Sequence, residues 1–224
     1  MKVLKYQFWH FLSLLIMLLL LFFFIDYDNT ILEGEFMNIS TKTWLIISIL
    51  SPIVHQVYVV ICWRIELYYK GLSKAFGSVE NAFKLYKIGF AILILSRLVT
   101  ISILAYSNKE TLDFAPYIFN AIAIIIAIPA IYLFYSVRKY FGMDRAFGID
   151  HFKPNEIKKI PFVKKGIFKY TSNGMYIYGF LILWIPGLLL MSKAALLIAL
   201  FNYMYIWVHY YFTELPDIKV IYKD

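Results

Sequence analysis

The stretch GIFKYTSNGMYIYG, residues 166–179, decides how the C-terminal part of this chain folds. It joins a strongly basic segment to an apolar run, residues 175–191, through an Asn-Gly turn signal. A second apolar run, residues 194–212, follows after just enough chain to reverse direction. Because lipid offers backbone groups no partners outside a helix, we expect a helical hairpin that stops at residues 213–217.

The composition of the whole chain is that of a membrane protein. Of the 224 residues, 62% are hydrophobic and only 16% are charged, which is too apolar for a soluble domain of this length. The formal charge of +8 would suggest nucleic acid in a soluble protein. In a membrane protein, the positive charge instead sets the orientation of the chain in the membrane and attracts anionic lipid headgroups. The single cysteine, Cys62, excludes an intramolecular disulfide, and we interpret it as a buried, inert thiol.

Four further apolar runs precede the hairpin, at residues 11–25, 43–63, 85–106 and 114–137. The first resembles a signal peptide, but it is long and no small-residue cleavage site follows it, so we expect an uncleaved span. We therefore predict an all-α, polytopic membrane helix bundle of about six transmembrane helices with a C-terminal helical hairpin. It forms one domain, residues 1–224, in which residues 1–137 are four spans and residues 138–224 hold a basic segment, the hairpin and the tail.

Polar residues inside the predicted spans are expected to face other helices, because lipid cannot pair with them. His55 and Gln56 follow Pro52 by one turn, and Pro52 and Pro129 are expected to kink their helices. Arg97 has a structural interpretation, either as a side chain that reaches the interface or as the partner in an internal ion pair.

The distribution of Lys and Arg predicts the orientation. The N-terminus, residues 64–87, residues 138–169 and the tail hold 18 of them, whereas the intervening loops hold three. The positive-inside rule then places both termini and the 166–179 stretch in the cytoplasm. We expect an integral protein of a bacterial inner membrane or of the endoplasmic reticulum, with its site facing the cytoplasm.

The C-terminal residues resemble a known family, the integral-membrane methyltransferases that include the phosphatidylethanolamine N-methyltransferases and the isoprenylcysteine carboxyl methyltransferases. Their first block reads roughly Gly-x-aromatic-basic-x-x-x-His/Asn-Pro-Met-Tyr-x-x-Gly, and a Glu-containing block follows the hairpin. The matching residues are Gly166, Phe168, Lys169, Asn173, Met175, Tyr176 and Gly179, then Glu214, Pro216, Ile221 and Tyr222. Gly174 replaces the usual Pro and Leu215 replaces a second Glu, and the resemblance covers about the last 85 residues.

This resemblance implies S-adenosylmethionine as methyl donor and a set of binding residues. Glu214 would hold the ammonium of the donor, and Asn173 with the first amides of the following helix would donate to its carboxylate. Tyr176 and Gly179 lie three residues apart, so they share one helix face. The expected donor-binding residues are Asn173, Gly174, Met175, Tyr176, Gly179, His209 and Glu214. Without the resemblance, Asn173 would be a helix cap and Glu214 a solvated acid.

His209 belongs to a polar stripe on the last apolar run. Asn202, Tyr205, His209 and Thr213 recur at helical spacing, which puts them on one face directed at a cavity or at other helices. Hydrogen bonding between helices, with no ligand, is the alternative explanation.

The segment before the first block could act on the methyl acceptor. Arg145 could bind an anionic headgroup, and Asp150, His151 or Glu214 could accept the proton that an ammonium must lose before it attacks. As plain juxtamembrane surface, the upstream residues would need no function. No metal ligand set is expected.

The predicted function is transfer of a methyl group from S-adenosylmethionine to a membrane lipid, with a phospholipid ethanolamine amine as the favoured acceptor. A prenylated cysteine carboxylate is the alternative within the family. An NADPH-dependent membrane reductase has a similar hairpin, and a small transporter or structural partner is the alternative without catalysis. We expect the lipid bilayer and a lipid substrate as partners, and no nucleic acid.

Overall fold

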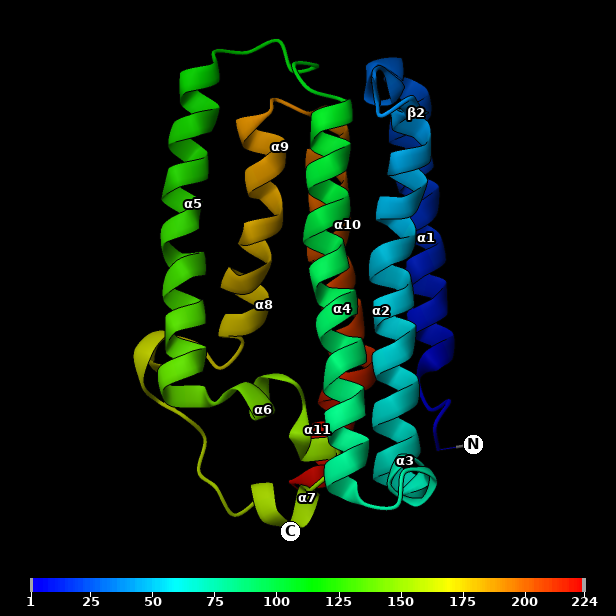
Figure 1. The fold of residues 1–224 in the computed structure, drawn as a ribbon, viewed down its shortest axis with the longest axis vertical. Coiled ribbons are helices and arrows are strands. Elements are labelled where there is room, and N and C mark those ends of the chain that lie inside the picture. Colours follow the sequence, from blue (N-terminus) through cyan, green and yellow to red (C-terminus); the bar gives the residue numbers. More distant parts are fainter. Residues whose placement is uncertain (1, 223–224) are drawn as a thin grey trace.

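The computed structural model describes residues 2–222, and helices make up nearly all of its regular structure. Five helices are long and apolar enough to cross a membrane. They are α1 (Gln7–Tyr27), α2 (Thr41–Tyr69), α4 (Val79–Ser107), α5 (Pro116–Ser136) and α10 (Lys193–His209). They run roughly along one axis (Figure 1). The predicted all-α membrane bundle is therefore confirmed.

Short elements connect the long helices. At one end they are the 3₁₀ turn η1 (Asn29–Leu32) and the antiparallel strands β1 (Glu35–Phe36) and β2 (Ile39–Ser40). At the other end they are α3 (Gly71–Ala75), α6 (Met143–Ala146), η3 (Ile149–His151), α7 (Pro154–Ile157) and η4 (Gly166–Lys169). Helix α2 extends beyond the apolar run at residues 43–63 and continues to Tyr69 before α3 begins.

The sixth predicted span is irregular rather than a continuous helix. It consists of α8 (Gly174–Tyr178), the 3₁₀ turn η5 (Gly179–Trp184) and α9 (Ile185–Leu189). The irregular turn η5 precedes Pro186 and Gly187. Pro186 lies in the first turn of α9. Backbone N–H groups in the first turn of a helix have no partner within that helix, so a proline is tolerated there.

The last helix does not stop at residues 213–217, so that prediction is wrong. After α10 the chain makes the π-helical turn η6 (Tyr210–Glu214) and continues as α11 (Leu215–Ile221). Pro216 was interpreted as a stop signal, yet it lies in the first turn of α11 and is tolerated there. Glu214 consequently lies within a helical segment instead of at a helix end.

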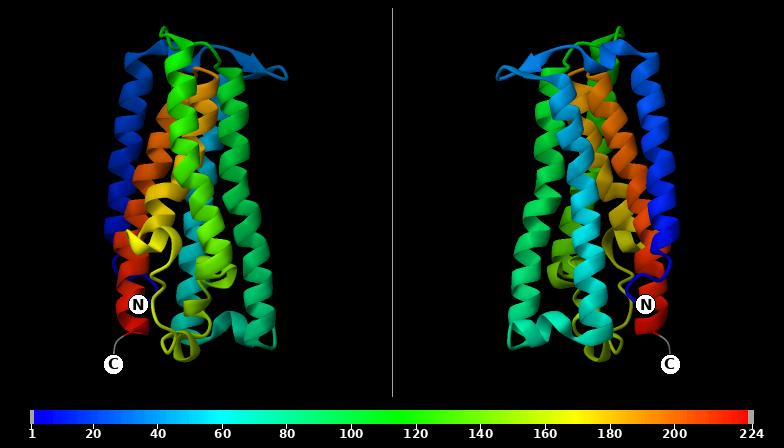
Figure 2. Two further views of the ribbon diagram at one scale, coloured as in Figure 1. Left: turned by 90° about the vertical axis from the view of Figure 1, so that its left-hand side faces the viewer. Right: turned by 90° about the vertical axis from the view of Figure 1, so that its right-hand side faces the viewer.

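The core of the bundle lies where α10 contacts α1, α2 and α4, and Figure 2 shows α1 alongside α10. Ala194, Ala195 and Ala199 of α10 are fully buried, and such small side chains let membrane helices approach closely. The predicted polar stripe of α10 also faces inward, because Asn202, Tyr205, His209 and Thr213 are all at most 2% exposed.

The two ends of the bundle differ in which segments they carry. The turn end carries the α1–α2, α4–α5 and α9–α10 connections, and the motif end carries α3, residues 142–173 and α11 (Figure 1). Both described ends of the chain also lie at the motif end (Figure 1).

Candidate active site

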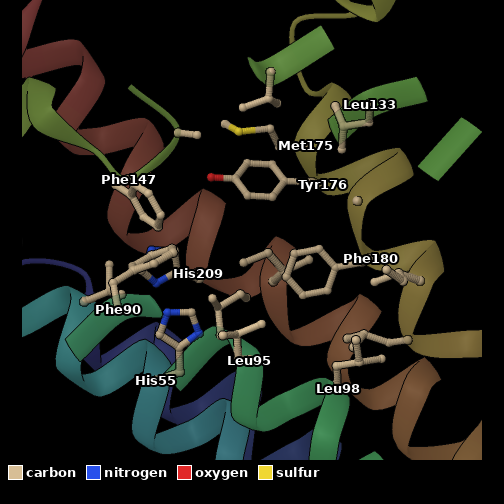
Figure 3. Close-up of a pocket in the computed structure, with 18 of the residues that line it drawn as sticks. His55, Phe90, Leu95, Leu98, Leu133, Phe147, Met175, Tyr176, Phe180 and His209 are labelled. Atoms are coloured by element: carbon tan, nitrogen blue, oxygen red, sulfur yellow. The ribbon is translucent and has the colours of Figure 1, made fainter. Parts of the chain in front are cut away.

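A cavity of about 360 Å³ lies beside the broken span. Its walls come from α2, α4, α5, residues 137–147, the α8–η5 segment and α10, and they are mainly apolar. Met175, Tyr176, Gly179 and His209, four of the expected donor-binding residues, line it. Figure 3 shows Met175 and Tyr176 across the cavity from the imidazoles of His209 and His55.

Glycines place the first motif block against α5. Gly166 has a positive φ of 59°, and a Cβ there would come within 2.6 Å of the Ser136 hydroxyl oxygen. That hydroxyl oxygen instead accepts a hydrogen bond from the Ile167 amide at 3.1 Å. A Cβ on Gly179 would come within 2.9 Å of Leu133. These close approaches fix the α8–η5 segment beside the cavity.

A glycine also brings His151 close to the cavity. Gly148 has a φ of 81°, and a Cβ on it would clash with the Trp63 indole at 2.4 Å. The turn therefore packs directly on Trp63, and the His151 ring stacks on the same indole with 3.9 Å between ring centroids. Trp63 lines the cavity, so it separates His151 from that space.

Asp217 connects the motif end to α2. Its carboxylate accepts hydrogen bonds from Arg64 Nε at 3.2 Å and from the Tyr68 hydroxyl at 3.3 Å, and His151 Nε2 lies 3.6 Å away. Arg64 also donates to the carbonyls of Val3, Lys5 and Phe212. Sequence reasoning missed this pair, because 153 residues separate its members and neither belongs to a motif.

Asp150 and Arg145 meet through Tyr222. The Tyr222 hydroxyl donates to Asp150 Oδ2 at 2.5 Å and accepts from Arg145 Nη2 at 3.5 Å. Burial and the hydrogen bond to Asp150 raise the pKa of Tyr222 to about 12, so its hydroxyl keeps its proton at neutral pH. Tyr222, which the second motif block contains, thus positions two residues predicted to act on the acceptor.

Several buried polar atoms around these residues have no hydrogen-bond partner within residues 2–222. At the motif end they include Glu214 Oε2, Asp150 Oδ1, Arg145 Nε, Trp63 Nε1, the Tyr86 hydroxyl, His209 Nδ1 and both His151 ring nitrogens. Leaving one such atom unpaired costs about 1 to 3 kcal/mol, so a cluster of them indicates a ligand. The set combines carboxylate acceptors with N–H donors, which fits the ammonium and carboxylate groups of S-adenosylmethionine.

The expected residues do not all gather at one point. Asn173 and Gly174 are outside the cavity lining, and the Asn173 side chain makes no capping hydrogen bond to α8. Asp150, His151, Glu214 and Arg145 form the neighbouring polar cluster rather than the cavity wall. The structure adds His55, Gln56 and Trp63 of α2 to the cavity lining. The sequence signal for His55 and Gln56 was their polarity inside a predicted span, whereas Trp63 gave no signal beyond its place in an apolar run.

Comparison with known proteins identifies the C-terminal part of the chain. Residues 118–224 match the family model described as phospholipid methyltransferase, so the match includes nearly all of α5 as well as the two motif blocks. No curated protein and no solved structure matches the chain. Residues 118–224 therefore form a domain of the phospholipid methyltransferase family, a family of membrane enzymes that use S-adenosylmethionine.

Proposed function

We propose that the protein methylates the amine of an ethanolamine phospholipid at the motif end of the bundle. The observation that carries this proposal is the cluster of buried, unpartnered polar atoms beside an apolar cavity. An amphiphilic acceptor needs both environments side by side. The methyl donor, when bound, supplies an electrophilic methyl group on a sulfonium, and the residues of the chain bind, orient and exclude water.

In this proposal Glu214 and Asp150 bind positive charge. Glu214 Oε2 and Asp150 Oδ1 are the unpartnered carboxylate oxygens of the cluster within the described chain. Trp63 Nε1 and Arg145 Nε are donors for the carboxylate of the methyl donor. Met175, Tyr176 and Gly179 form the wall against which the bound groups pack.

The acceptor amine must be neutral to attack, because an ammonium has no lone pair. Its proton therefore leaves before the new N–C bond forms, and the His151 imidazole and the Asp150 carboxylate are the acceptors we propose for it. His151 Nε2 lies 3.6 Å from the Asp217 carboxylate. The Tyr222 hydroxyl, which keeps its own proton, fixes Asp150 in place.

The cavity is open to lipid between α4 and α5. Leu95 of α4 and Phe134 of α5 both line it, yet they are 61% and 53% exposed. A lipid could therefore enter sideways without leaving the bilayer. Lysines of the segment between α7 and α8 would concentrate anionic headgroups nearby, at about 1 kcal/mol each near a charged membrane. They are Lys158, Lys159, Lys164, Lys165 and Lys169.

We further propose that the motif end faces the cytoplasm, as the Lys and Arg distribution predicts. Single cysteines test this in a Cys62→Ser background: Lys109→Cys at the turn end and Ser172→Cys at the motif end, both at exposed positions. In intact cells a membrane-impermeant maleimide should label only Lys109→Cys. Labelling of Ser172→Cys alone would reverse the orientation.

The activity is tested with purified protein in mixed micelles, labelled S-adenosylmethionine and separate acceptors. We expect label on phosphatidylethanolamine and its partly methylated forms, and a slower reaction at high salt because lipid capture is screened. Glu214→Gln should reduce the rate, whereas Asp144→Asn, an exposed acid paired with Lys87, should not. Label on a farnesylcysteine analogue, with the phospholipids unlabelled, would refute the lipid-amine assignment.

A further inference from the structure

The cavity is not built from the methyltransferase domain alone. The family match begins at residue 118, yet His55, Gln56 and Trp63 of α2 and Phe90, Leu95 and Leu98 of α4 line the cavity. All of these residues lie in the N-terminal half of the chain, which therefore does more than anchor the domain. Most of these side chains are apolar and suit contact with an acyl chain. His55 differs from them, because its imidazole is polar.

His55 is a buried imidazole without a protein partner. Its side chain is part of the cavity wall, the residue is 3% exposed, and neither ring nitrogen has a hydrogen-bond partner within residues 2–222. The ring packs edge-on against Phe90 with 4.6 Å between centroids, which holds it in place (Figure 3). A fixed imidazole with both nitrogens unsatisfied requires a ligand group.

Arg97 lies behind this part of the wall and also lacks an anion. It is 0% exposed and forms no ion pair in the described part of the chain, so both sequence-based interpretations, an interface-reaching side chain and an internal ion pair, are wrong. Its Nη2 donates weakly to the Pro52 carbonyl at 3.4 Å, one helical turn from His55, and its Nε and Nη1 are unpartnered. The guanidinium packs on Phe180, a cavity residue, at 5.5 Å.

An isolated buried cation is strongly unfavourable, and ionisable groups inside membranes mark functional sites. Arg97 and His55 together leave one cavity wall with N–H donors and positive charge but no carboxylate. The motif end, by contrast, supplies the carboxylates of Glu214 and Asp150. A ligand with an anion at the His55 wall and an ammonium toward the motif end satisfies both regions.

The depth of His55 suits a lipid phosphate. His55 packs on Phe90, which follows Lys87 by three residues, about 4.5 Å along the helix axis. Lys87 pairs with the exposed Asp144 at 2.8 Å, so charged groups reach water at that level. A phospholipid whose amine lies at the motif end would carry its phosphate slightly deeper, with acyl chains leaving between α4 and α5.

We propose that His55, supported by the charge of Arg97, binds the phosphodiester anion of the phospholipid acceptor. This inference rests on the proposed function and makes helices α2 and α4 the part of the protein that selects phospholipids. The carboxylate of the methyl donor is the other anion that could occupy the site. The phosphodiester is favoured because Trp63 Nε1 and Arg145 Nε remain for the carboxylate of the donor.

The test compares phosphatidylethanolamine with sphingosine, a lipid amine that has no phosphate. His55→Phe keeps the ring packing on Phe90 and removes both nitrogens, and Arg97→Met keeps an unbranched side chain without charge. Each variant should raise the apparent KM for phosphatidylethanolamine about tenfold, because one charge-assisted hydrogen bond is lost. The apparent KM for sphingosine should stay unchanged. His55→Gln, which retains a donor, should restore part of the loss.

His10→Phe is the matched control, because His10 is a buried membrane imidazole that bonds Tyr205 instead of facing the cavity. It should leave the preference between the two acceptors unchanged. The Kd for S-adenosylmethionine should stay at the wild-type value in His55→Phe. An equal rise of the apparent KM for both acceptors would overturn the proposal. A higher Kd for S-adenosylmethionine with an unchanged preference between the acceptors would also overturn it.

Binding without turnover separates this inference from the proposed function. If wild-type protein methylates neither lipid, the proposed function fails. Retention of phosphatidylethanolamine over sphingosine by native mass spectrometry, without methyl donor, then decides the phosphate site. Wild type should retain the phospholipid preferentially and His55→Phe should not. Identical retention by the two proteins would refute the site, and Arg97→Met is not required for this comparison.

Discussion

The two ends of the bundle treat buried polar groups in opposite ways. At the turn end, Asn108 is 1% exposed and its amide is fully used: Nδ2 donates to the carbonyls of Thr30 and Glu33, and Oδ1 accepts from Thr111, Ser192 and Ala194. At the motif end, Glu214 Oε2 and both ring nitrogens of His151 have no partner within the described chain.

The difference separates structure from function. A complete hydrogen-bond network holds the connecting loops in place and leaves no free donor or acceptor for a ligand. An incomplete one, buried beside a cavity, leaves acceptors and donors whose partners must come from outside the chain. The motif end nevertheless also contains fully partnered groups. The Arg64–Asp217 pair is one of them, and the first prediction concerns it.

Removing Arg64 should give the largest effect on stability. Arg64→Met would leave Asp217 as an uncompensated buried charge and free the chain around Val3 and Lys5, at a cost of about 3 to 5 kcal/mol. Unfolding of purified protein in detergent measures the loss. Arg138→Met, at an exposed arginine, should change stability little. Equal stability of the two variants would show that the pair does not hold the motif end.

Asn108→Leu should have the next largest effect and should act on stability alone. Five hydrogen-bond partners at the turn end lose their acceptor or donor, which should cost about 2 to 3 kcal/mol. Asn120→Leu, on the exposed face of α5, is the control. Folded Asn108→Leu protein should bind S-adenosylmethionine as wild type does. Weakened donor binding would mean that the two ends do not differ in role.

The partly buried pair of Asp28 and Lys193 at the turn end should give the smallest effect, and this effect should depend on pH. Hydrogen bonds from Lys193 and Thr30 lower the pKa of Asp28 from 3.8 to about 2. Because the folded pKa is the lower one, the stabilisation is fully present above pH 3.8 and is lost as pH falls through about 2. Asp28→Asn should therefore be slightly less stable than wild type near neutral pH and equal to it in strong acid. A difference that grows on acidification would contradict this origin.

The sequence predicted those features that depend on local pattern. Apolar runs located the spans, the spacing of Asn202, Tyr205, His209 and Thr213 identified the buried face of α10, and the motif residues Met175, Tyr176 and Gly179 do line the cavity. Each of these follows from helical periodicity or from residues close together in the chain.

What the sequence did not reveal depends on contacts between distant segments. Pro216 suggests a helix stop, but it lies in the first turn of α11, which follows η6 directly. Arg64 pairs with Asp217 across 153 residues, and no spacing rule connects them. Arg97 was given a structural role because its lack of an anionic partner becomes visible only once the neighbouring helices are in place.

Calorimetric titration of S-adenosylmethionine into wild type, Glu214→Gln and Asn108→Leu in detergent tests the central claim most directly, namely that the unpartnered polar groups of the motif end bind the methyl donor. Wild type and Asn108→Leu should bind equally well, and Glu214→Gln should bind more weakly by about 1.5 to 3 kcal/mol, the value of a charged hydrogen-bond partner. Wild-type affinity in Glu214→Gln would contradict the claim.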